Sequence, residues 1–300
     1  MSLGKVLVTG GAGFIGTHLV QFALERSSEV VVADLQGQSN PEAHHVVADI
    51  RDKNVLFDRI SGKFDTVFHL AAKTSVLQSI NNPQEVFETN VIGTHNVLEL
   101  ARATGAQRIL LASTNAVVGN WTGTEITENS PLRPLTPYGS TKASAEMLSS
   151  AYSASYELRA MQLRLTNVYG EGMSKKDSVI PRLMRTAQGS ASFHIYGDGA
   201  QYRDYVYVKD VVRAFIHLAE TNGEGPVIIG SGTSITVNSM IEKVSKATGV
   251  SISYDHVEAK PGEMRGVSVD NSLAKSLGVR FEVEIDEGLR RTWSDFRLSR

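Results

Sequence analysis

The sequence predicts an α/β protein built on a doubly wound parallel sheet. Over most of the 300 residues, short apolar and often β-branched runs alternate with longer segments of helical periodicity. A glycine-rich turn joins the first run, Val6–Val8, to the helix-like segment Phe14–Arg26, and a second buried run, Glu29–Asp34, ends in an acid. Alternating strands and helices of this kind form a parallel sheet covered by helices on both faces.

The turn after Val6–Val8 is typical of a dinucleotide phosphate-binding loop. Two glycine registers fit it, Gly11-x-Gly13-x-x-Gly16 and Gly10-x-x-Gly13-x-x-Gly16. Glycine permits positive φ and lets a pyrophosphate approach the backbone N–H groups. The phosphate would lie at the N-terminus of the next helix, where free N–H groups and the helix dipole favour an anion. The alternative is a turn that only packs the helix on the sheet.

The acid at the end of the second run, Asp34, supports the dinucleotide interpretation. It lies 18 residues beyond Gly16. A carboxylate there accepts hydrogen bonds from the adenosine ribose and repels a 2′-phosphate, which favours NAD over NADP. Strand, turn, helix, strand and acid in this order predict a Rossmann-type NAD site.

The same patterns predict the elements that follow. The expected strands are His45–Ala48, Thr66–Leu70, Arg108–Ala112, Ala160–Leu165 and Val227–Gly230. The expected helices lie near Pro83–Thr104, Pro137–Tyr156 and Val208–Thr221. A last amphipathic helix, Glu287–Arg297, places Leu289, Trp293 and Phe296 on one face, which we expect to pack in a core.

Three segments interrupt the alternation with glycine, proline and polar residues: Ser113–Pro137, Val168–Tyr202 and Ser253–Val269. They are too long for ordinary connections, so we expect them to build a second lobe over the carboxyl edge of the sheet, where such sheets bind ligands. The expected division is an NAD-binding domain of residues 1–167, to which 204–232 return, and a substrate-binding lobe of 168–203 and 233–300.

The composition narrows the class of protein. A net charge of -2 with mixed signs gives no case for a nucleic-acid or membrane-surface partner. The chain has no cysteine, and its eight histidines show no ligand spacing, so we expect no metal site. With no apolar run of membrane-spanning length and no signal peptide, the expected location is the cytoplasm.

The stretch Pro137–Lys142 is a candidate for chemistry. If a helix begins near Pro137, Tyr138 and Lys142 lie one turn apart on the same face. A neighbouring ammonium stabilises a phenolate and lowers a tyrosine pKa that is ordinarily about 10, so Tyr138 is a candidate proton acceptor. From the spacing alone, a core tyrosine beside a surface lysine remains the favoured alternative.

A resemblance reverses that preference. In order along the chain, the motifs resemble the extended short-chain dehydrogenase/reductase family, and especially its NAD-dependent sugar epimerase/dehydratase branch with the UDP-glucose 4-epimerases. The first group of motifs is Gly10–Gly16, Asp34, His69–Ala72, Asn90, Gly93–Thr94, Thr114, Val117, Gly119, Tyr138 and Lys142. The second is Arg164, Asn167–Gly170, Val179–Pro181, Tyr196–Gly199, Arg203–Val208 and Pro261–Glu263, so the resemblance covers nearly the whole chain.

The resemblance implies roles for individual residues. Tyr138 would be the base, Lys142 would hold the nicotinamide ribose and tune Tyr138, and Thr114 would bond the reacting sugar hydroxyl. NAD would be bound by Gly10, Gly13, Phe14, Ile15, Gly16, Asp34, Asp49, Ile50, Leu70, Ala71, Ala72, Lys73, Asn90, Tyr138 and Lys142. The nucleotide diphosphate of the substrate would be bound by Asn167, Val179, Arg203 and Arg265. Arginine suits that anion because it pairs bidentately with phosphate.

Departures from the family pattern narrow the expected reaction. The 4,6-dehydratases and decarboxylases of the family carry acids at the two positions after Thr114, whereas this chain has Asn115 and Ala116. Epimerisation needs no such acid. Two substitutions bear on the substrate: Val118 replaces a usual tyrosine and Lys260 a phosphate-contacting arginine. Val267 stands where hexose-restricted epimerases often carry a bulky tyrosine, which leaves room for an N-acetylated sugar.

We therefore expect an NAD-dependent nucleotide-sugar 4-epimerase, of the UDP-glucose/UDP-galactose type, that acts by transient oxidation at C4 and hydride return. A nucleotide-sugar dehydrogenase or 4-ketoreductase would use the same residues. A non-catalytic NAD-sensing regulator is a further alternative, which the intact Thr114, Tyr138 and Lys142 disfavour.

The helix expected at Pro83–Thr104 suggests a homodimer. It carries a stripe of Phe87, Val91, Thr94, Leu98 and Ala101, with Val86, Ile92, Val97 and Leu100 on its other faces. This is more apolar surface than one sheet contact readily covers. We expect a second chain to meet it and Pro137–Tyr156 in a four-helix arrangement, as the resemblance also implies. The alternative is that the second lobe covers this surface within one chain.

Overall fold

The computed structural model describes residues 3–37, 40–120, 125–258 and 266–298. Its centre is one seven-stranded sheet in the order β10-β6-β5-β4-β1-β2-β3, parallel throughout, which confirms the doubly wound fold. The strands are β1 (Lys5–Thr9), β2 (Glu29–Asp34), β3 (His44–Val47), β4 (Thr66–His69), β5 (Arg108–Thr114), β6 (Arg159–Leu165) and β10 (Gly225–Ile229). From β1 the chain first builds outward to β3 and then in the opposite direction from β4, so the order reverses between β1 and β4.

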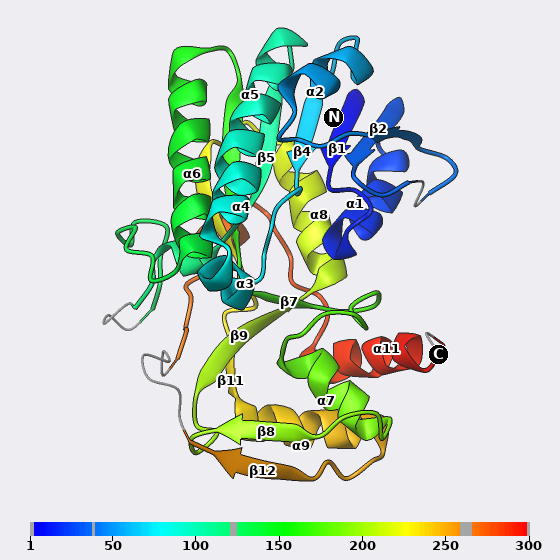
Figure 1. Ribbon diagram of the computed structural model, residues 1–300, viewed down its shortest axis with the longest axis vertical. Coiled ribbons are helices and arrows are strands. Elements are labelled where there is room, and N and C mark those ends of the chain that lie inside the picture. The colour runs from blue at the N-terminus through cyan, green and yellow to red at the C-terminus, as the bar shows by residue number, and fades with distance from the viewer. Residues whose placement is uncertain (1–2, 38–39, 121–124, 259–265, 299–300) are drawn as a thin grey trace.

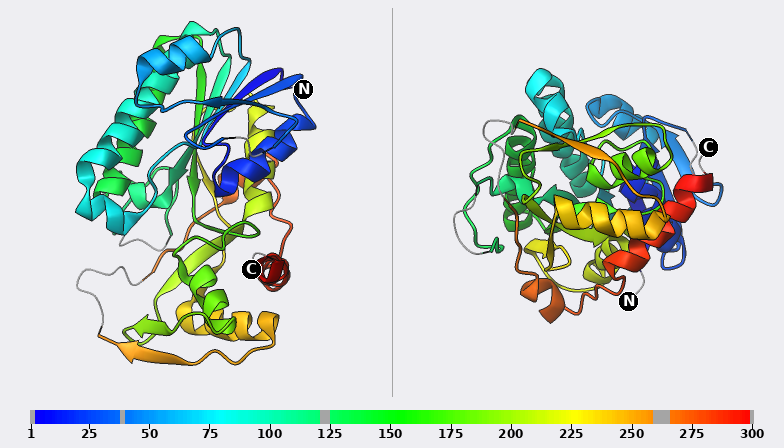
Figure 2. Two further views of the ribbon diagram at one scale, coloured as in Figure 1. Left: turned by 45° about the vertical axis from the view of Figure 1, so that its right-hand side comes forward. Right: turned by 90° about the horizontal axis from the view of Figure 1, so that it is seen from below.

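Helices cover both faces of the sheet (Figures 1 and 2). One face carries α1 (Phe14–Leu24) and α8 (Val208–Ala219), and the other carries α2 (Lys53–Arg59), α5 (Gly93–Ala103) and α6 (Pro137–Ser155). Within β1, Val6 and Val8 pack toward the first face while Leu7 packs toward the second. Because both faces are covered, the strands are continuous apolar runs, as the sequence indicated.

The helix expected at Pro83–Thr104 is not one regular α-helix. It consists of α4 (Pro83–Phe87), a π-helical segment η1 (Glu88–Ile92) and α5. A π-turn adds a residue to the helical repeat and rotates the side chains that follow, so a fixed 3.6-residue period cannot locate it.

This rotation changes the stripe expected to face a second chain. Thr94, Leu98 and Ala101 are buried within the chain, so most of the predicted stripe is wrong as an interface. Of the apolar residues expected along this helix, Phe87 and Ile92 are the large ones that remain exposed.

A second hydrophobic cluster lies beyond the carboxyl edge of the sheet, in the lower half of Figure 1. Its elements are β7 (Asn167–Tyr169), α7 (Val179–Ala187), β8 (Phe193–Tyr196), β9 (Tyr202–Tyr207), β11 (Ser234–Thr236), α9 (Val237–Thr248) and α11 (Ile285–Leu298), and the exposed strand β12 (Tyr254–Val257) pairs with β8. Leu289 and Phe296 are buried in it and Trp293 packs against it, which confirms the expected role of the last helix. The division into two domains remains a prediction.

The buried carboxylate of Asp204, on β9, ties this part of the chain to the sheet. It accepts hydrogen bonds from Thr166 Oγ1 at 2.6 Å, Ser231 N at 2.9 Å, Ser231 Oγ at 2.8 Å and Thr233 N at 3.0 Å. Four donors satisfy a charge that burial would otherwise penalise. The junction between β6, β10 and β9 is thereby fixed beside Arg203.

Candidate active site

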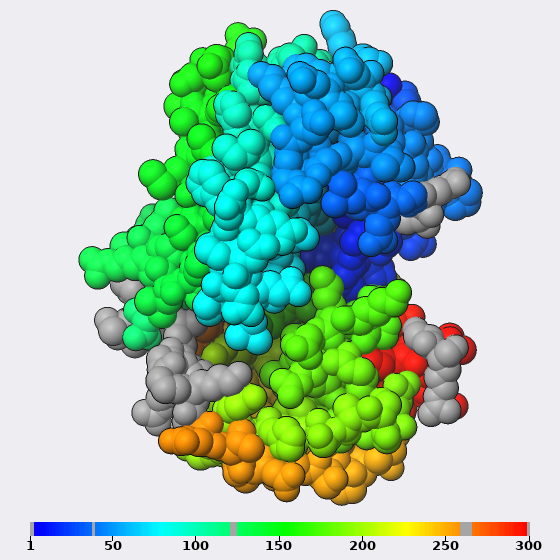
Figure 3. Space-filling model, in the orientation of Figure 1, coloured from blue at the N-terminus to red at the C-terminus, as the bar shows by residue number. Residues whose placement is uncertain are grey.

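A cavity of about 810 Å³ opens at the carboxyl edge of the sheet, where the strand order reverses between β1 and β4. Parallel sheets bind ligands at this place. In Figure 3, blue and cyan residues of the sheet half meet green residues of the second part across this region. The predicted site residues that line it are Gly10, Gly13, Phe14, Ile15, Gly16, Asp34, Asp49, Ile50, Leu70, Ala71, Ala72, Lys73, Thr114, Tyr138, Lys142, Asn167 and Arg203.

The glycine turn brings the start of α1 to the cavity. Gly10 has φ 74°, and a Cβ there would lie 2.5 Å from Ala71 N. A Cβ on Gly16 would lie 2.1 Å from Gly10 O, so neither position accepts a side chain. Within the described ranges no side chain caps α1 at Gly13, and its first N–H groups remain for an anion.

Asp34 lies at the end of β2, at the wall of the cavity. Its Oδ2 accepts a hydrogen bond from Ala12 N at 3.0 Å and its Oδ1 from Gln36 N at 3.1 Å. The carboxylate therefore fixes the glycine turn and keeps further lone pairs for hydroxyl donors.

On the next part of the wall, Asp49 is paired with Arg51. Arg51 Nη2 donates to Asp49 Oδ2 at 2.6 Å, and this hydrogen bond lowers the pKa of the carboxyl group. Ile50 is buried beside them, with its carbonyl bonded to Asn96 Nδ2 at 2.9 Å. Arg51 also lines the cavity and is not among the predicted site residues.

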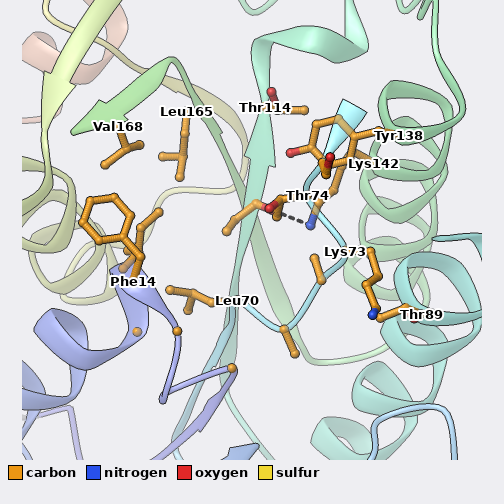
Figure 4. A pocket seen from close by; sticks show the side chains of 18 of the residues that line it. Phe14, Leu70, Lys73, Thr74, Thr89, Thr114, Tyr138, Lys142, Leu165 and Val168 are labelled. Carbon is orange, nitrogen blue, oxygen red and sulfur yellow. Dashed lines mark hydrogen bonds between the residues drawn. The ribbon is translucent and has the colours of Figure 1, made fainter. Parts of the chain in front are cut away.

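Asn90 does not line the cavity but supports its wall. Its Oδ1 accepts from Lys73 N at 2.8 Å, and its Nδ2 donates to Lys73 O at 3.0 Å and Thr141 Oγ1 at 3.0 Å. The preceding residue, Thr89, lines the cavity instead (Figure 4). Its Oγ1 is buried and has no hydrogen-bond partner among the described residues, so a ligand hydroxyl would satisfy it.

His69 connects β1, β4 and the π-helical segment. Its Nδ1 is 2.7 Å from Thr9 Oγ1 and its Nε2 is 2.9 Å from Thr94 Oγ1, which in turn donates to Asn90 O at 2.6 Å. Burial, with the charge of Lys142, lowers the pKa of His69 to about 3. The ring is neutral and acts as a fixed link behind the cavity.

Tyr138 and Lys142 point into the cavity from one face of α6 (Figure 4). Thr136 caps the helix by accepting from Gly139 N at 3.2 Å, which places both residues in its first turns. Lys142 is 5% exposed and its Nζ donates to Ala112 O at 2.9 Å. Burial lowers the pKa of Lys142 to about 8, with the charge of Glu146 opposing the shift.

The pKa of Tyr138 differs from the sequence-based expectation. We expected the Lys142 ammonium to lower it, but burial raises the pKa of Tyr138 to about 12, and a hydrogen bond with Thr114 acts in the opposite direction. Spacing predicts which groups are neighbours, but it does not predict how much water surrounds them.

Of the residues predicted to bind the nucleotide diphosphate of the substrate, two line the cavity and one does not. Asn167 on β7 and Arg203 on β9 line the cavity opposite the sheet, on what we call its lower wall. Asn167 Nδ2 donates to Asp204 O at 2.9 Å. Val179 does not line the cavity, because it is the first residue of α7 and packs against the second cluster. The three residues before it, Lys176, Asp177 and Ser178, line the cavity instead. Arg265 lies outside the described residues, as does Lys260.

The comparison with known families identifies the chain. The model of the NAD dependent epimerase/dehydratase family matches residues 6–230. The chain belongs to this family. A putative UDP-glucose 4-epimerase from Methanocaldococcus jannaschii is 36% identical over 296 residues, which cover 95% of this chain and 96% of that protein.

Solved structures of epimerases are similar to this member of the epimerase/dehydratase family over its whole length. The UDP-glucose 4-epimerase of Thermotoga maritima with UDP-glucose has a TM-score of 0.91 at 32% identity, covering 98% of this chain and 99% of that one. The UDP-N-acetylglucosamine 4-epimerase of Methanobrevibacter ruminantium, in complex with UDP-N-acetylmuramic acid, has a TM-score of 0.91 at 28% identity and covers both chains fully.

The cavity suits the NAD that gives the family its name. The uncapped start of α1 provides N–H groups for a pyrophosphate, Asp34 provides acceptors at the end of β2, and the buried Thr89 hydroxyl lacks a partner within the described chain. Among the described residues, no cluster of three or more histidine or acidic side chains could hold a metal ion, and no helix is long and apolar enough to cross a bilayer.

Proposed function

We propose that this protein is an NAD-dependent nucleotide-sugar 4-epimerase that acts on UDP-sugars. One observation carries the proposal: Thr114, Tyr138 and Lys142 meet in the cavity while the two positions after Thr114 are Asn115 and Ala116. The names of the relatives support the same activity, UDP-glucose 4-epimerase for two and UDP-N-acetylglucosamine 4-epimerase for the third.

In this proposal the cofactor binds to the side of the cavity formed by the seven-stranded sheet and its helices. The first turn of α1 receives the pyrophosphate, Asp34 accepts from the adenosine ribose, and Lys142 and Thr89 contact the nicotinamide side. Bound NAD supplies the acceptor and donor of the hydride at C4 of the sugar.

Proton transfer falls to Tyr138. Tyr138, as the phenolate, accepts the proton of the C4 hydroxyl and becomes the phenol, and Thr114 hydrogen-bonds the same hydroxyl. Because burial raises the pKa of Tyr138 to about 12, the phenolate must be stabilised when substrate binds, and Lys142, one helical turn away, supplies the positive charge. The proton leaves the C4 hydroxyl oxygen and the hydride leaves C4, which gives the 4-keto sugar. Both return after that sugar turns over, so the reaction has no net oxidation.

The lower wall would bind the nucleotide diphosphate. Arg203 and Asn167 contribute polar groups there, and Arg265 would add a second guanidinium. Val267, a small side chain at the cavity wall, leaves room for an N-acetyl group. We therefore include UDP-N-acetylated hexoses among the proposed substrates.

The deciding experiment incubates the purified protein with UDP-glucose or UDP-N-acetylglucosamine, with no added NAD, and follows the C4 configuration by NMR. An epimerase inverts C4 without accumulating NADH. A dehydrogenase or 4-ketoreductase would need added cofactor and change it in proportion to product, and a non-catalytic regulator would do neither. Matched dTDP- and GDP-sugars would test the choice of nucleotide.

We also propose that the protein is a cytoplasmic homodimer. The lack of cysteine is compatible with a reducing compartment. Large apolar side chains are exposed on neighbouring helices that pack on one another: α3 (Val76–Asn81), α4, η1 and α6. Away from the cavity they are Ile80, Phe87, Ile92 and Met147, while Val76 and Leu77 of α3 are also exposed but line the cavity. An apolar surface of this kind on a globular chain is typical of a protein interface.

A further inference from the structure

The end of β5 is joined to α6 by three consecutive residues. Lys142 Nζ donates to the carbonyl of Ala112, Ser113 Oγ donates to Glu146, and Thr114 lines the cavity beside Tyr138 and acts on its pKa. Tyr138, Lys142 and Glu146 are each four residues apart and form one row on α6. The proposed function uses the first two members of this row but not Glu146.

Glu146 belongs to a buried ion pair. Arg164, on β6, reaches Glu146 Oε2 with Nη2 at 2.8 Å and Oε1 with Nε at 3.1 Å. The two side chains are 4% and 6% exposed. Ser113 and Arg164 are direct partners in the β5–β6 register, so both contacts reach the carboxylate from the same level of the sheet. A protein in which apolar residues replace such a buried ion pair is often equally stable, so a gain in stability does not explain why Glu146 and Arg164 are charged.

We propose that Glu146 is a positioning residue whose negative charge keeps Lys142 protonated, with Arg164 limiting that effect. The proposal deepens the proposed function and rests on it, because the protonated Lys142 is what stabilises the Tyr138 phenolate. Lys142 is buried, and burial alone favours its neutral form. If Glu146 lost its charge, the buried Arg164 would lose its ionic partner, and its positive charge would favour the neutral lysine further.

Other ionisable groups on the elements around α6 do not replace Glu146. His69 on β4 is neutral, since its pKa lies near 3. On α4, Glu85 pairs with Lys73 at 2.7 Å. On α5, Glu99 bonds Arg102 and Tyr152, and His95 Nδ1 lies 3.3 Å from the same Tyr152 hydroxyl. Glu88 in η1 accepts from Gln84.

The arginines at the starts of β5 and β6 bond elsewhere. Arg108 donates to the carbonyl of Ala219, and Arg159 donates to the carbonyl of Thr221. Glu146 is the carboxylate that lies one turn from Lys142 on the same row of α6.

The test compares two single variants that remove opposite charges, Glu146→Gln and Arg164→Met, with the double variant. The pKa of Lys142 is measured by NMR titration of carbon-13-labelled lysine, with the signal assigned through Lys142→Arg. We expect that pKa to fall by about one unit or more in Glu146→Gln, to rise in Arg164→Met, and to return near the wild-type value in the double variant. The high-pH limb of the kcat profile should move in the same directions.

A purely structural role predicts a different result. Both single variants would then lower kcat and melting temperature with the Lys142 titration unshifted, and that outcome would overturn the proposal. If Glu146→Gln fails to fold, Arg164→Met and the double variant still give the comparison, and equal Lys142 pKa values in these two would also overturn it. A wild-type protein without epimerase activity would refute the proposed function, while the NMR titration would still decide the role of Glu146.

Discussion

At the scale of single residues, the surroundings of Tyr138 determine its chemistry. Tyr138 is 9% exposed, and burial raises its pKa to about 12 while Thr114 acts in the opposite direction. Such a group is a proton acceptor only beside a cation and a correctly placed hydroxyl. We expect Tyr138→Phe to lower kcat by about a hundred- to ten-thousand-fold with little change in KM, because the oxygen acts on the proton in transit. Steady-state kinetics measures both values, and more than about a tenth of wild-type kcat would rule out the base.

The Asp34 carboxylate has two roles that an experiment must distinguish: it accepts from the glycine turn, and we propose that it also accepts from the adenosine ribose. Asp34→Ala should weaken NAD binding and improve NADP binding relative to NAD, because it removes both the acceptor and the charge that repels a 2′-phosphate. Asp34→Asn is the matched control, since an amide oxygen can still accept from Ala12 N. Calorimetric titration of both cofactors measures the ratio. An unchanged NAD:NADP ratio in both variants would mean that another residue recognises the ribose.

The sequence predicted those site residues that belong to local motifs. Tyr138 and Lys142 are one turn apart, and Asp34 ends a strand, so their positions follow from periodicity. Thr89 and Glu146 could not be found this way. Glu146 matters because of its partner Arg164, which lies on another element. Thr89 matters because its buried hydroxyl has no hydrogen-bond partner among the described residues.

At the scale of elements, the turn between β1 and α1 requires glycine for steric reasons. Gly16→Ala would place a Cβ 2.1 Å from Gly10 O, so the first turn of α1 must move away from the phosphate position. We expect NAD affinity to fall at least about tenfold, together with a lower melting temperature. Gly37→Ala is the control, because a Cβ there meets no atom of the described residues within 4 Å. Wild-type NAD affinity in Gly16→Ala would show that the turn is not the pyrophosphate site.

Regular elements followed from periodicity, while irregular ones did not. Strand β2 has the predicted bounds, and α6 ends one residue before the predicted position. Strand β5 runs two residues longer than predicted, because Ser113 and Thr114 are polar yet stay in the ladder with β6. The π-helical η1 was missed because its hydrogen bonds depend on tertiary contacts, among them Asn90 with Lys73.

At the scale of the whole molecule, the arrangement of the two parts determines the site. The loops after β1, β4 and β5 approach Asn167 and Arg203 across the cavity, and Asp204 fixes that approach. Composition and segment length predicted that long insertions exist over the sheet edge. They could not predict which residue of each insertion faces the cavity, so Val179 was chosen where Lys176, Asp177 and Ser178 lie.

The proposed homodimer can be tested by changing exposed side chains on α4 and α6. Phe87 is 49% exposed and Met147 is 65% exposed, on helices that pack side by side. Burying such side chains between two chains removes apolar area from water, whereas a buried unpaired carboxylate is costly. We expect the wild-type protein to sediment at twice its chain mass of 32.6 kDa, and Phe87→Glu/Met147→Glu to sediment near 32.6 kDa. Val250→Glu, at an exposed apolar position just after α9, should remain dimeric. A wild-type protein that sediments only near 32.6 kDa at low micromolar concentration would refute the dimer and leave the chemistry proposed for Tyr138 unaffected.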